Sequence, residues 1–232
     1  MIGIVIPVHN EARLLEACLD AALAAAHHPG LHGEEVAIVV VLDDCTDGSA
    51  DIVGRYPVLS LAMTVRNVGV VRAAGAERLL ERGARWLAFT DADSRVSADW
   101  LEQQLRQCAD VVCGTVAVED WSDHRHHATQ LEEHFRLTYS DADGHRHVHG
   151  ANLGLSAEAY RSVGGFMPLA SSEDVALVEA LQAAGARIAW SAAPRVITSA
   201  RRVARAPAGF AAALCHAVDA MLSVQKGPVV PV

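Results

Sequence analysis

Short apolar runs that alternate with helical segments are the feature that most constrains the fold of this chain. The runs are rich in Val, Ile and Leu with little polar alternation, which is typical of strands buried on both faces of a sheet. The intervening segments are long enough to carry a helix, so parallel strands with right-handed crossovers are expected. The expected strands cover residues 2–8, 36–42, 59–65, 86–90 and 110–118. The pattern predicts an α/β fold with a mostly parallel sheet.

The helical segments have recognisable ends. Asn10 is expected to cap a helix whose apolar positions begin at Leu14 and recur at helical spacing. Gly83 is expected to end the helix that follows Asn67, and Ser97 to cap the next one. Helices between consecutive parallel strands would cover both faces of the sheet.

Length and composition narrow the class of protein. The chain has 232 residues, of which 51% are hydrophobic, and this can supply the core of one α/β domain. A formal charge of −9 argues against extended contacts with nucleic acid phosphates. Five cysteines form an odd set without a C-x-x-C pair, which argues against a disulfide framework or a structural zinc site. Reduced thiols in the cytoplasm are expected instead.

No secretory or membrane-spanning segment is expected. The chain enters its first apolar run without the basic region and small-residue cleavage site of a signal peptide. The apolar run at 207–224 contains His216 and Asp219, and it is too short and too polar for a transmembrane span. A packed helix is favoured there, while a dimer face or peripheral contact with a membrane surface stays open.

Polar side chains follow four of the expected strands. They are Pro7, His9, Asn10 and Glu11 after the first strand, Asp43 and Asp44 after the second, Arg66 and Asn67 after the third, and Asp91 and Asp93 after the fourth. Because the carboxyl ends of parallel strands lie along one edge of a sheet, these groups are expected to line one ligand crevice.

The acidic pair Asp91 and Asp93 suggests a metal–diphosphate site. A divalent cation held by one or two carboxylates usually takes its remaining oxygen ligands from water and phosphate. The alternative is a simple turn, since aspartate is common where strands end. The same triplet recurs at Asp141 and Asp143, just before Gly144, where a turn is the better interpretation.

The second half of the chain is less regular. Residues 121–148 are rich in histidine, which suggests either a metal-binding tract or, in better agreement with the spacing, a solvated helix followed by a turn. Glu173 and Asp174 stand at the head of an apolar helix, where capping alone could explain them. Arg201 and Arg202 suggest contact with an anion, or else a solvated face.

Taken in order, these motifs resemble those of the family 2 glycosyltransferases, which have the Rossmann-like GT-A fold. The resemblance covers about residues 1–200 and rests on six segments in compatible order. They are residues 7–11, residues 43–48, Asn67 to Gly69 with Arg72, the triplet at Asp91 and Asp93, Gly150 to Asn152, and the pair Glu173 and Asp174.

The resemblance implies an inverting, single-displacement transfer of a sugar from a nucleotide-diphosphate donor to a hydroxyl acceptor. It implies that Mg²⁺ or Mn²⁺ is held by Asp93, with Asp91 reaching the ribose or sugar, and that Asp174 is the base beside Glu173. It implies nucleotide contacts from Pro7, His9, Asn10, Glu11, Asp43 or Asp44, Asn67, Arg72 and Asp91, and sugar or acceptor contacts from Gly150, Ala151 and Asn152. A single domain over 1–232 would then divide into a nucleotide-binding half at 1–118, a half at 119–200 with the acceptor site and base, and a helical tail at 201–232.

Departures from the family pattern refine these expectations. Processive members carry a Gln-x-x-Arg-Trp segment and membrane helices that are not found here, so transfer of a single sugar is expected. Many GT-A enzymes offer a histidine ligand after the base, whereas Thr198 and Ser199 stand there in this chain. The alternatives are a sugar nucleotidyltransferase, which would need a glycine-rich loop after the first strand, and a catalytically silent binding module. A homo-oligomer is compatible with all three.

Overall fold

The computed structural model describes residues 1–202, 210, 212, 214 and 215. It divides into two compact units, which are described separately. The first comprises Met1–Ala117 with Asp141–Thr198, and the second comprises Val118–Ser140 with Ser199–Val232. The predicted boundaries at 118 and 200 stay predictions, and most of the helical tail predicted at 201–232 lies outside the described residues.

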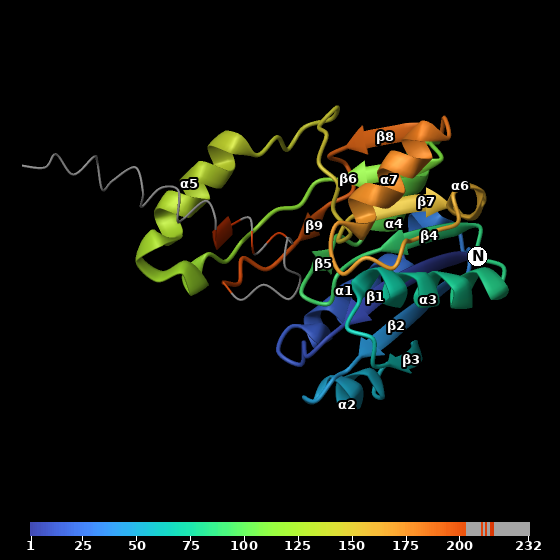
Figure 1. The fold of residues 1–232 in the computed structure, drawn as a ribbon, viewed down its shortest axis with the longest axis horizontal. Helices are drawn as coiled ribbons and strands as arrows, with labels where there is room; N and C mark the ends of the chain where they lie inside the picture. Colours follow the sequence, from blue (N-terminus) through green and yellow to red (C-terminus); the bar gives the residue numbers. More distant parts are fainter. Residues whose placement is uncertain (203–209, 211, 213, 216–232) are drawn as a thin grey trace, which may run out of the picture. The chain divides into compact units, whose positions relative to one another are not determined.

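A seven-stranded sheet forms the centre of the first unit (Figure 1). Its strands in spatial order are β3 (Leu59–Met63), β2 (Val36–Asp43), β1 (Ile2–Val8), β4 (Trp86–Phe89), β7 (Leu153–Ser156), β6 (Val111–Gly114) and β8 (Ile188–Ser191). Strand β7 runs antiparallel to both neighbours, and every other pairing in this sheet is parallel. The mostly parallel α/β sheet predicted from the sequence is confirmed.

Helices cover both faces of this sheet, which explains the continuous apolar strands. They are α1 (Leu15–Ala26), α2 (Ser49–Val53), α3 (Val68–Glu81), α4 (Trp100–Arg106), α6 (Ala157–Ser162) and α7 (Glu173–Ala183), with a short 3₁₀ turn, η1 (Pro29–Leu31). Alternate strand residues such as Val5 and Phe89 share one core cluster with α3, α6 and α7. Their neighbours, such as Ile4 and Ile6, are equally buried toward the other face, where α1 contacts α4. A two-stranded sheet, β5 (Arg95–Val96) with β9 (Val196–Ile197), completes this unit.

Two predicted helix caps are wrong. Helix α1 begins at Leu15 and has no side-chain cap, because Asn10 lies five residues earlier in a left-handed conformation with φ of 54°. Helix α4 begins at Trp100, and the Ser97 hydroxyl donates to Asp99 Oδ1 at 2.7 Å instead of capping a backbone N–H. Helix α3, in contrast, has a side-chain cap that was not predicted: Asn67 Oδ1 accepts from the Val70 N–H at 3.1 Å.

The second unit is small and mostly helical. It contains η2 (Ser122–His127) and α5 (Ala128–Thr138), whose outward residues are exposed as predicted for a solvated helix. Trp121 and Leu131 form a core cluster with Ala200 and Leu214.

Among the described residues, no three His, Cys, Asp or Glu side chains are placed to hold a metal ion. None of the described helices is long and apolar enough to cross a membrane.

Candidate active site

Hydrogen bonds join the polar segments that follow β1 and β2. The Nδ1–H of His9 donates to the carbonyl oxygen of Asp43 at 2.6 Å. Oδ1 of Asn10 accepts from the backbone N–H groups of Thr46 and Asp47, at 2.7 and 3.3 Å. The two segments therefore lie together at the carboxyl edge of the sheet, as the parallel strand order requires.

Pro7 and Glu11 flank His9 and Asn10 along the same segment. Pro7 lies in β1, in register with Val41 of β2. Glu11 is buried, and its backbone N–H donates to Ser49 Oγ at 3.0 Å. These contacts attach the segment after β1 to the start of α2, so its backbone is fixed before any ligand arrives.

The neighbouring acids Asp43 and Asp44 have different environments. The buried Asp43 carboxylate accepts three backbone N–H groups, from Val65 at 2.8 Å, Arg66 at 3.0 Å and Asn67 at 3.2 Å. Asp44 is partly exposed, has φ of 50° and pairs with the Arg66 guanidinium at 3.0 Å. Asp43 therefore orders the loop before α3, while Asp44 is the acid that a nucleotide could reach.

Arg72 lies at the centre of the site. This α3 residue is only 4% exposed, and its guanidinium pairs with Glu173 through Nη1 and with Asp91 through Nη2. Gly150 packs so closely against the guanidinium that a Cβ there would clash with it. Arg72 thus connects the segment after β4, the start of α7 and the segment before β7.

Asp174 follows Glu173 at the start of α7. Its Oδ2 accepts the backbone N–H of Gly150 at 2.6 Å. Ser172 precedes α7 in a left-handed conformation and makes no side-chain cap, so serine capping does not explain this acidic helix start. Burial, with a further contribution from the Asp174 charge, raises the pKa of the Cys113 thiol to about 12.

One hydroxyl group contacts the second acid of the triplet, and a second hydroxyl group contacts the first hydroxyl. Ser94 Oγ lies 3.2 Å from Asp93 Oδ1 and 2.9 Å from Thr198 Oγ1. Thr198 is one of the two residues that stand in this sequence where a histidine ligand would be expected. The structure brings it beside the triplet, and the oxygen donors near Asp93 suit a hard divalent cation.

The sequence model of the family described as "Glycosyl transferase family 2" matches residues 3–164. The chain belongs to glycosyl transferase family 2. The family and the enzyme class predicted from the sequence are confirmed at this level.

Relatives and solved structures agree with this assignment. Over 120 residues the chain is 30% identical to TuaG of Bacillus subtilis (strain 168), a glycosyltransferase named for teichuronic acid biosynthesis; the match covers 47% of this chain and 44% of TuaG. Its fold resembles S. aureus TarS 1-349 in complex with UDP-GlcNAc, with a TM-score of 0.62, 16% identity, and coverage of 90% of this chain and 61% of that one.

A third similar protein is the mannosyltransferase PcManGT from Pyrobaculum calidifontis in complex with GDP-Man and Mn²⁺. It has a TM-score of 0.60 and 19% identity, with coverage of 99% of this chain and 65% of that one. At such identities the solved structures show the GT-A fold alone. The chain spans less than two thirds of each of these relatives.

Not every residue expected to contact sugar in this family 2 chain has a side chain available to a ligand. Asn152 is fully buried; its Nδ2 donates to the carbonyl oxygens of Thr115 and Pro194, and its Oδ1 accepts from Trp100 Nε1 at 2.8 Å. Its side chain therefore connects neighbouring segments of the protein and has no group left to contact a sugar. Ala151 is also buried, which leaves the Gly150 backbone as the part of this segment next to Arg72 and Asp174.

The second acidic triplet is structural, as predicted for a turn. Asp141 accepts from Thr115 Oγ1 at 2.6 Å and pairs with Arg195. Asp143 accepts from Ser191 Oγ and from the Ala192 N–H. Both carboxylates therefore attach their turn to the end of β8 and the segment after it. Arg201 and Arg202 belong to the second compact unit, so their predicted anion contact stays a prediction.

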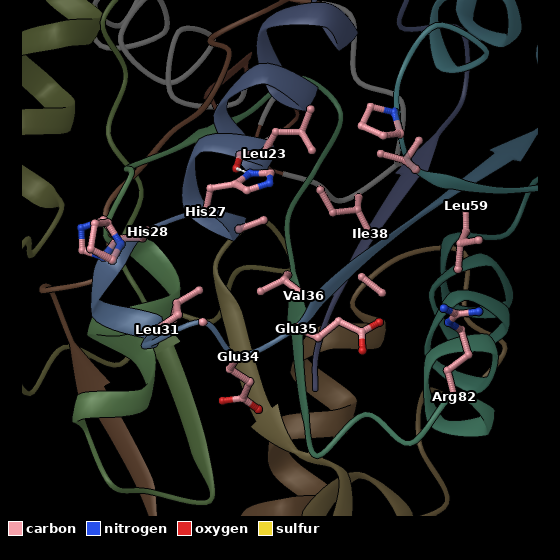
Figure 2. A pocket seen from close by; sticks show the side chains of 16 residues that line it. Leu23, His27, His28, Leu31, Glu34, Glu35, Val36, Ile38, Leu59 and Arg82 are labelled. Atoms are coloured by element: carbon pink, nitrogen blue, oxygen red, sulfur yellow. Dashed lines mark hydrogen bonds between the residues drawn. The ribbon is translucent and has the colours of Figure 1, made fainter.

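A cavity of about 670 Å³ lies away from the family 2 site, at the amino-terminal ends of β2 and β3 (Figure 2). None of the predicted site residues lines it. Three of its polar groups have partners: Glu34 pairs with Arg85, His28 with Glu102, and His27 donates to the Leu23 carbonyl oxygen. No reacting groups converge there, so the group of acidic and polar residues at the carboxyl edge of the sheet is the candidate active site.

Sequence analysis missed two groups at this site. Ser94 follows the triplet directly, and its adjacency to Asp93 was an available signal. His149 precedes Gly150, and the Asp91 charge acts on its imidazole. Its alternation with His145 and His147 is visible in the sequence.

Proposed function

We propose that this site transfers one sugar from a nucleotide-diphosphate sugar to an acceptor hydroxyl by a metal-assisted, inverting and non-processive reaction. The observation that carries the proposal is the connection of three carboxylates at the carboxyl edge of the sheet. Arg72 joins Asp91 to Glu173, and Asp174 follows Glu173 and holds Gly150. Acids suited to donor binding and to proton abstraction are thus held in one rigid network.

The nucleotide would bind across the ends of β1, β2 and β3. His9, Asn10 and Glu11 are fixed there by their contacts with the segment after β2, and Asp44 and Asn67 stand beside them. The complexes of TarS with UDP-GlcNAc and of PcManGT with GDP-Man support a sugar nucleotide as the donor. A bound base and ribose would place the diphosphate toward Asp91 and Asp93.

The residues near the triplet fit a divalent cation. Asp93 would hold Mg²⁺ or Mn²⁺, with Asp91 as a second carboxylate, and Ser94 and Thr198 would position Asp93 through their hydroxyl groups. When bound, the ion supplies positive charge that stabilises the departing nucleoside diphosphate.

Asp174 is the proposed base. An acceptor hydroxyl is a poor nucleophile until a carboxylate within hydrogen-bond reach takes its proton. The carboxylate of Glu173 is buried against Arg72, so it is not placed to attack the sugar carbon and form a covalent intermediate. Direct attack by the acceptor oxygen, with its proton passing to Asp174, inverts the configuration at that carbon.

The five free cysteines support action in a reducing compartment such as the cytoplasm.

Thermal unfolding with candidate nucleotides tests the donor site. Wild type, Asp93→Ala and the exposed-surface control Asp51→Ala would each be melted with UDP, GDP, dTDP or CDP, with and without Mn²⁺. A ligand that binds only the folded state adds about 2.7 kcal/mol at a hundredfold excess over its dissociation constant. One nucleotide should stabilise wild type and Asp51→Ala in a metal-dependent way, and Asp93→Ala should lose that effect.

Three outcomes are informative. No shift with any nucleotide would overturn the donor site. A shift that is equal without metal, or equal in Asp93→Ala, would remove the ion from the proposal. Nucleotide binding without turnover of any sugar nucleotide, including its hydrolysis by water, would favour a silent binding module.

A further inference from the structure

A short loop at residues 167–172, which we call the strap, leads directly into the proposed base. Glu173 and Asp174 follow it at the start of α7. The residue before the strap, Phe166, is buried in the main core cluster of the first unit. At the other end, the Glu173 carboxylate pairs with Arg72. Because both ends of the strap are fixed, the contacts along its middle determine how Asp174 is presented.

The start of α3 holds the middle of the strap through two hydrogen bonds. Nδ2 of Asn67 donates to the carbonyl oxygen of Pro168 at 3.1 Å. The backbone N–H of Gly69 donates to the carbonyl oxygen of Leu169 at 3.0 Å. The first N–H groups of a helix have no partner within the helix, so the Leu169 carbonyl satisfies one of them. The strap is therefore part of the cap of α3.

The strap packs on α3 without an intervening side chain. A Cβ at Gly69 would clash with the Met167 carbonyl oxygen and lie 2.9 Å from the Leu169 backbone nitrogen. The last strap residue, Ser172, has φ of 58°, a left-handed conformation that a residue with a Cβ keeps only where its surroundings enforce it. Close packing of the strap on the helix supplies that constraint immediately before the acidic pair.

Asn67 makes three contacts with three different groups. Its Oδ1 caps α3 by accepting the Val70 N–H, and its backbone N–H donates to the buried Asp43 carboxylate. Its Nδ2 takes no part in either contact and donates to Pro168 of the strap. The sequence predicts a nucleotide contact for Asn67, whereas both polar atoms of its side chain bind other segments of the protein. The contact with the strap can therefore be removed without removing the helix cap.

We propose that Asn67 is a positioning residue for the base: its amide N–H holds the strap, and the strap orients Asp174 toward the acceptor hydroxyl. This inference rests on the proposed function, because it takes Asp174 as the base. Asn67 caps α3, and Arg72 lies about 7.5 Å further along the axis of the same helix. Helix α3 thus holds the middle of the strap through Asn67 and its end through the Arg72 pair with Glu173.

The Gly150 amide reports the position of Asp174 in the protein without any ligand. Its N–H donates to Asp174 Oδ2 at 2.6 Å, so its NMR signal and its hydrogen exchange depend on where this carboxylate lies. Asn67→Ser keeps an oxygen that can cap α3 but has no N–H that reaches Pro168. In this variant the Gly150 signal should move, and its amide should exchange about tenfold faster, as expected for one lost hydrogen bond.

Two glycine variants separate displacement of the strap from loss of stability. Gly69→Ala adds a Cβ that pushes the strap away from α3, and it should move the Gly150 signal as Asn67→Ser does. Gly75→Ala, in the same helix, adds a Cβ that meets the Val5 side chain in the core. This matched control should lower the midpoint of unfolding and leave the Gly150 signal in place. The proposal is overturned if the signal stays unchanged in Asn67→Ser, or if Gly75→Ala moves it equally.

Titration and turnover distinguish positioning of the base from contact with the nucleotide. UDP and GDP, each with Mn²⁺, should bind Asn67→Ser as they bind wild type. Hydrolysis of UDP-GlcNAc or GDP-Man by water should show kcat lowered about tenfold with KM unchanged, because the donor still binds while the base is displaced. A weaker affinity for nucleotide with unchanged kcat would assign Asn67 to the nucleotide site and overturn the proposal.

The two levels of the inference fail differently. Intact nucleotide binding with an unmoved Gly150 signal in Asn67→Ser rejects only the positioning role. Absence of nucleotide binding in wild type rejects the proposed function itself.

Discussion

Arg72 of α3 and Glu173 of α7 form a buried ion pair across 101 positions of sequence. The same guanidinium holds Asp91 at the end of β4, so one side chain determines the positions of two acidic segments. Because Asp174 follows Glu173 directly, this pair also determines where the proposed base stands. Removing the arginine should therefore affect stability as well as chemistry.

Arg72→Met should lower the free energy of unfolding by about 3–5 kcal/mol, since it leaves the buried Glu173 carboxylate without its partner. Denaturant titration measures this. Arg78→Met, on the exposed face of the same helix, loses only a surface pair with Glu81 and should change stability by less than about 1 kcal/mol. Equal effects of the two substitutions would show that the buried ion pair contributes no more to the free energy of unfolding than the surface pair does.

Asp174→Asn should retain nucleotide binding and lose transfer. The amide still accepts the Gly150 N–H but cannot take a proton, so kcat should fall by about 10²–10⁴-fold. Glu179→Gln, an exposed position on the same helix, is the control for charge removal. Steady-state kinetics and nucleotide titration together decide the point, and unchanged turnover would remove Asp174 from the mechanism.

Gly150→Ala should disturb the two ion pairs that Arg72 makes with Asp91 and Glu173. The added Cβ would meet the Arg72 guanidinium, which two carboxylates prevent from moving aside. We expect a loss of about 1–3 kcal/mol of stability together with weaker donor binding. Gly54→Ala, where a Cβ makes only ordinary contacts, should be neutral. If Gly150→Ala behaved like this control, the site would be less tightly packed than it appears here.

His149 should make stability depend on pH. Its folded-state pKa is lowered from 6.5 to about 4, so below pH 6.5 the unfolded chain binds a proton that the folded chain does not. The stabilising effect is complete above pH 6.5 and is lost as the pH falls through 4, with a size of about 1–3 kcal/mol. Denaturant titrations of wild type and His149→Gln from pH 7.5 to 4.5 would measure it. The variant should lose less stability over this range, and parallel curves would contradict the assignment.

Positions of the strands and of the main acids could be predicted because both depend on local patterns. A parallel strand covered on both faces is continuously apolar, and its polar successor must stand at the sheet edge. The two acidic triplets look identical in isolation, but their neighbours in the sequence differ. Asp91 and Asp93 follow a buried strand, whereas Asp141 and Asp143 precede a glycine turn.

Features that depend on distant partners could not be predicted. Asn10 looked like a helix cap, but its amide oxygen binds backbone N–H groups 36 and 37 residues away. Asn152 resembled a sugar ligand, but its partners are Trp100, Thr115 and Pro194, far away in the sequence. Neighbouring residues in the sequence do not distinguish an asparagine that contacts a ligand from one whose side chain hydrogen-bonds other segments of the protein. The antiparallel direction of β7 likewise follows from tertiary pairing.

That strand has a consequence for biosynthesis. Strand β7 lies between β4 and β6, so a nascent chain that ends near residue 118 can align β1 to β4 but offers β6 no neighbour. Until residues 153–156 leave the ribosome, the edge of β4 stays open to pairing with other chains, and such edges favour aggregation. Completion of the sheet must therefore wait for the segment that follows Gly150. The same segment carries the Gly150 N–H that Asp174 accepts, so the sheet and this part of the site are completed by one late stretch of chain.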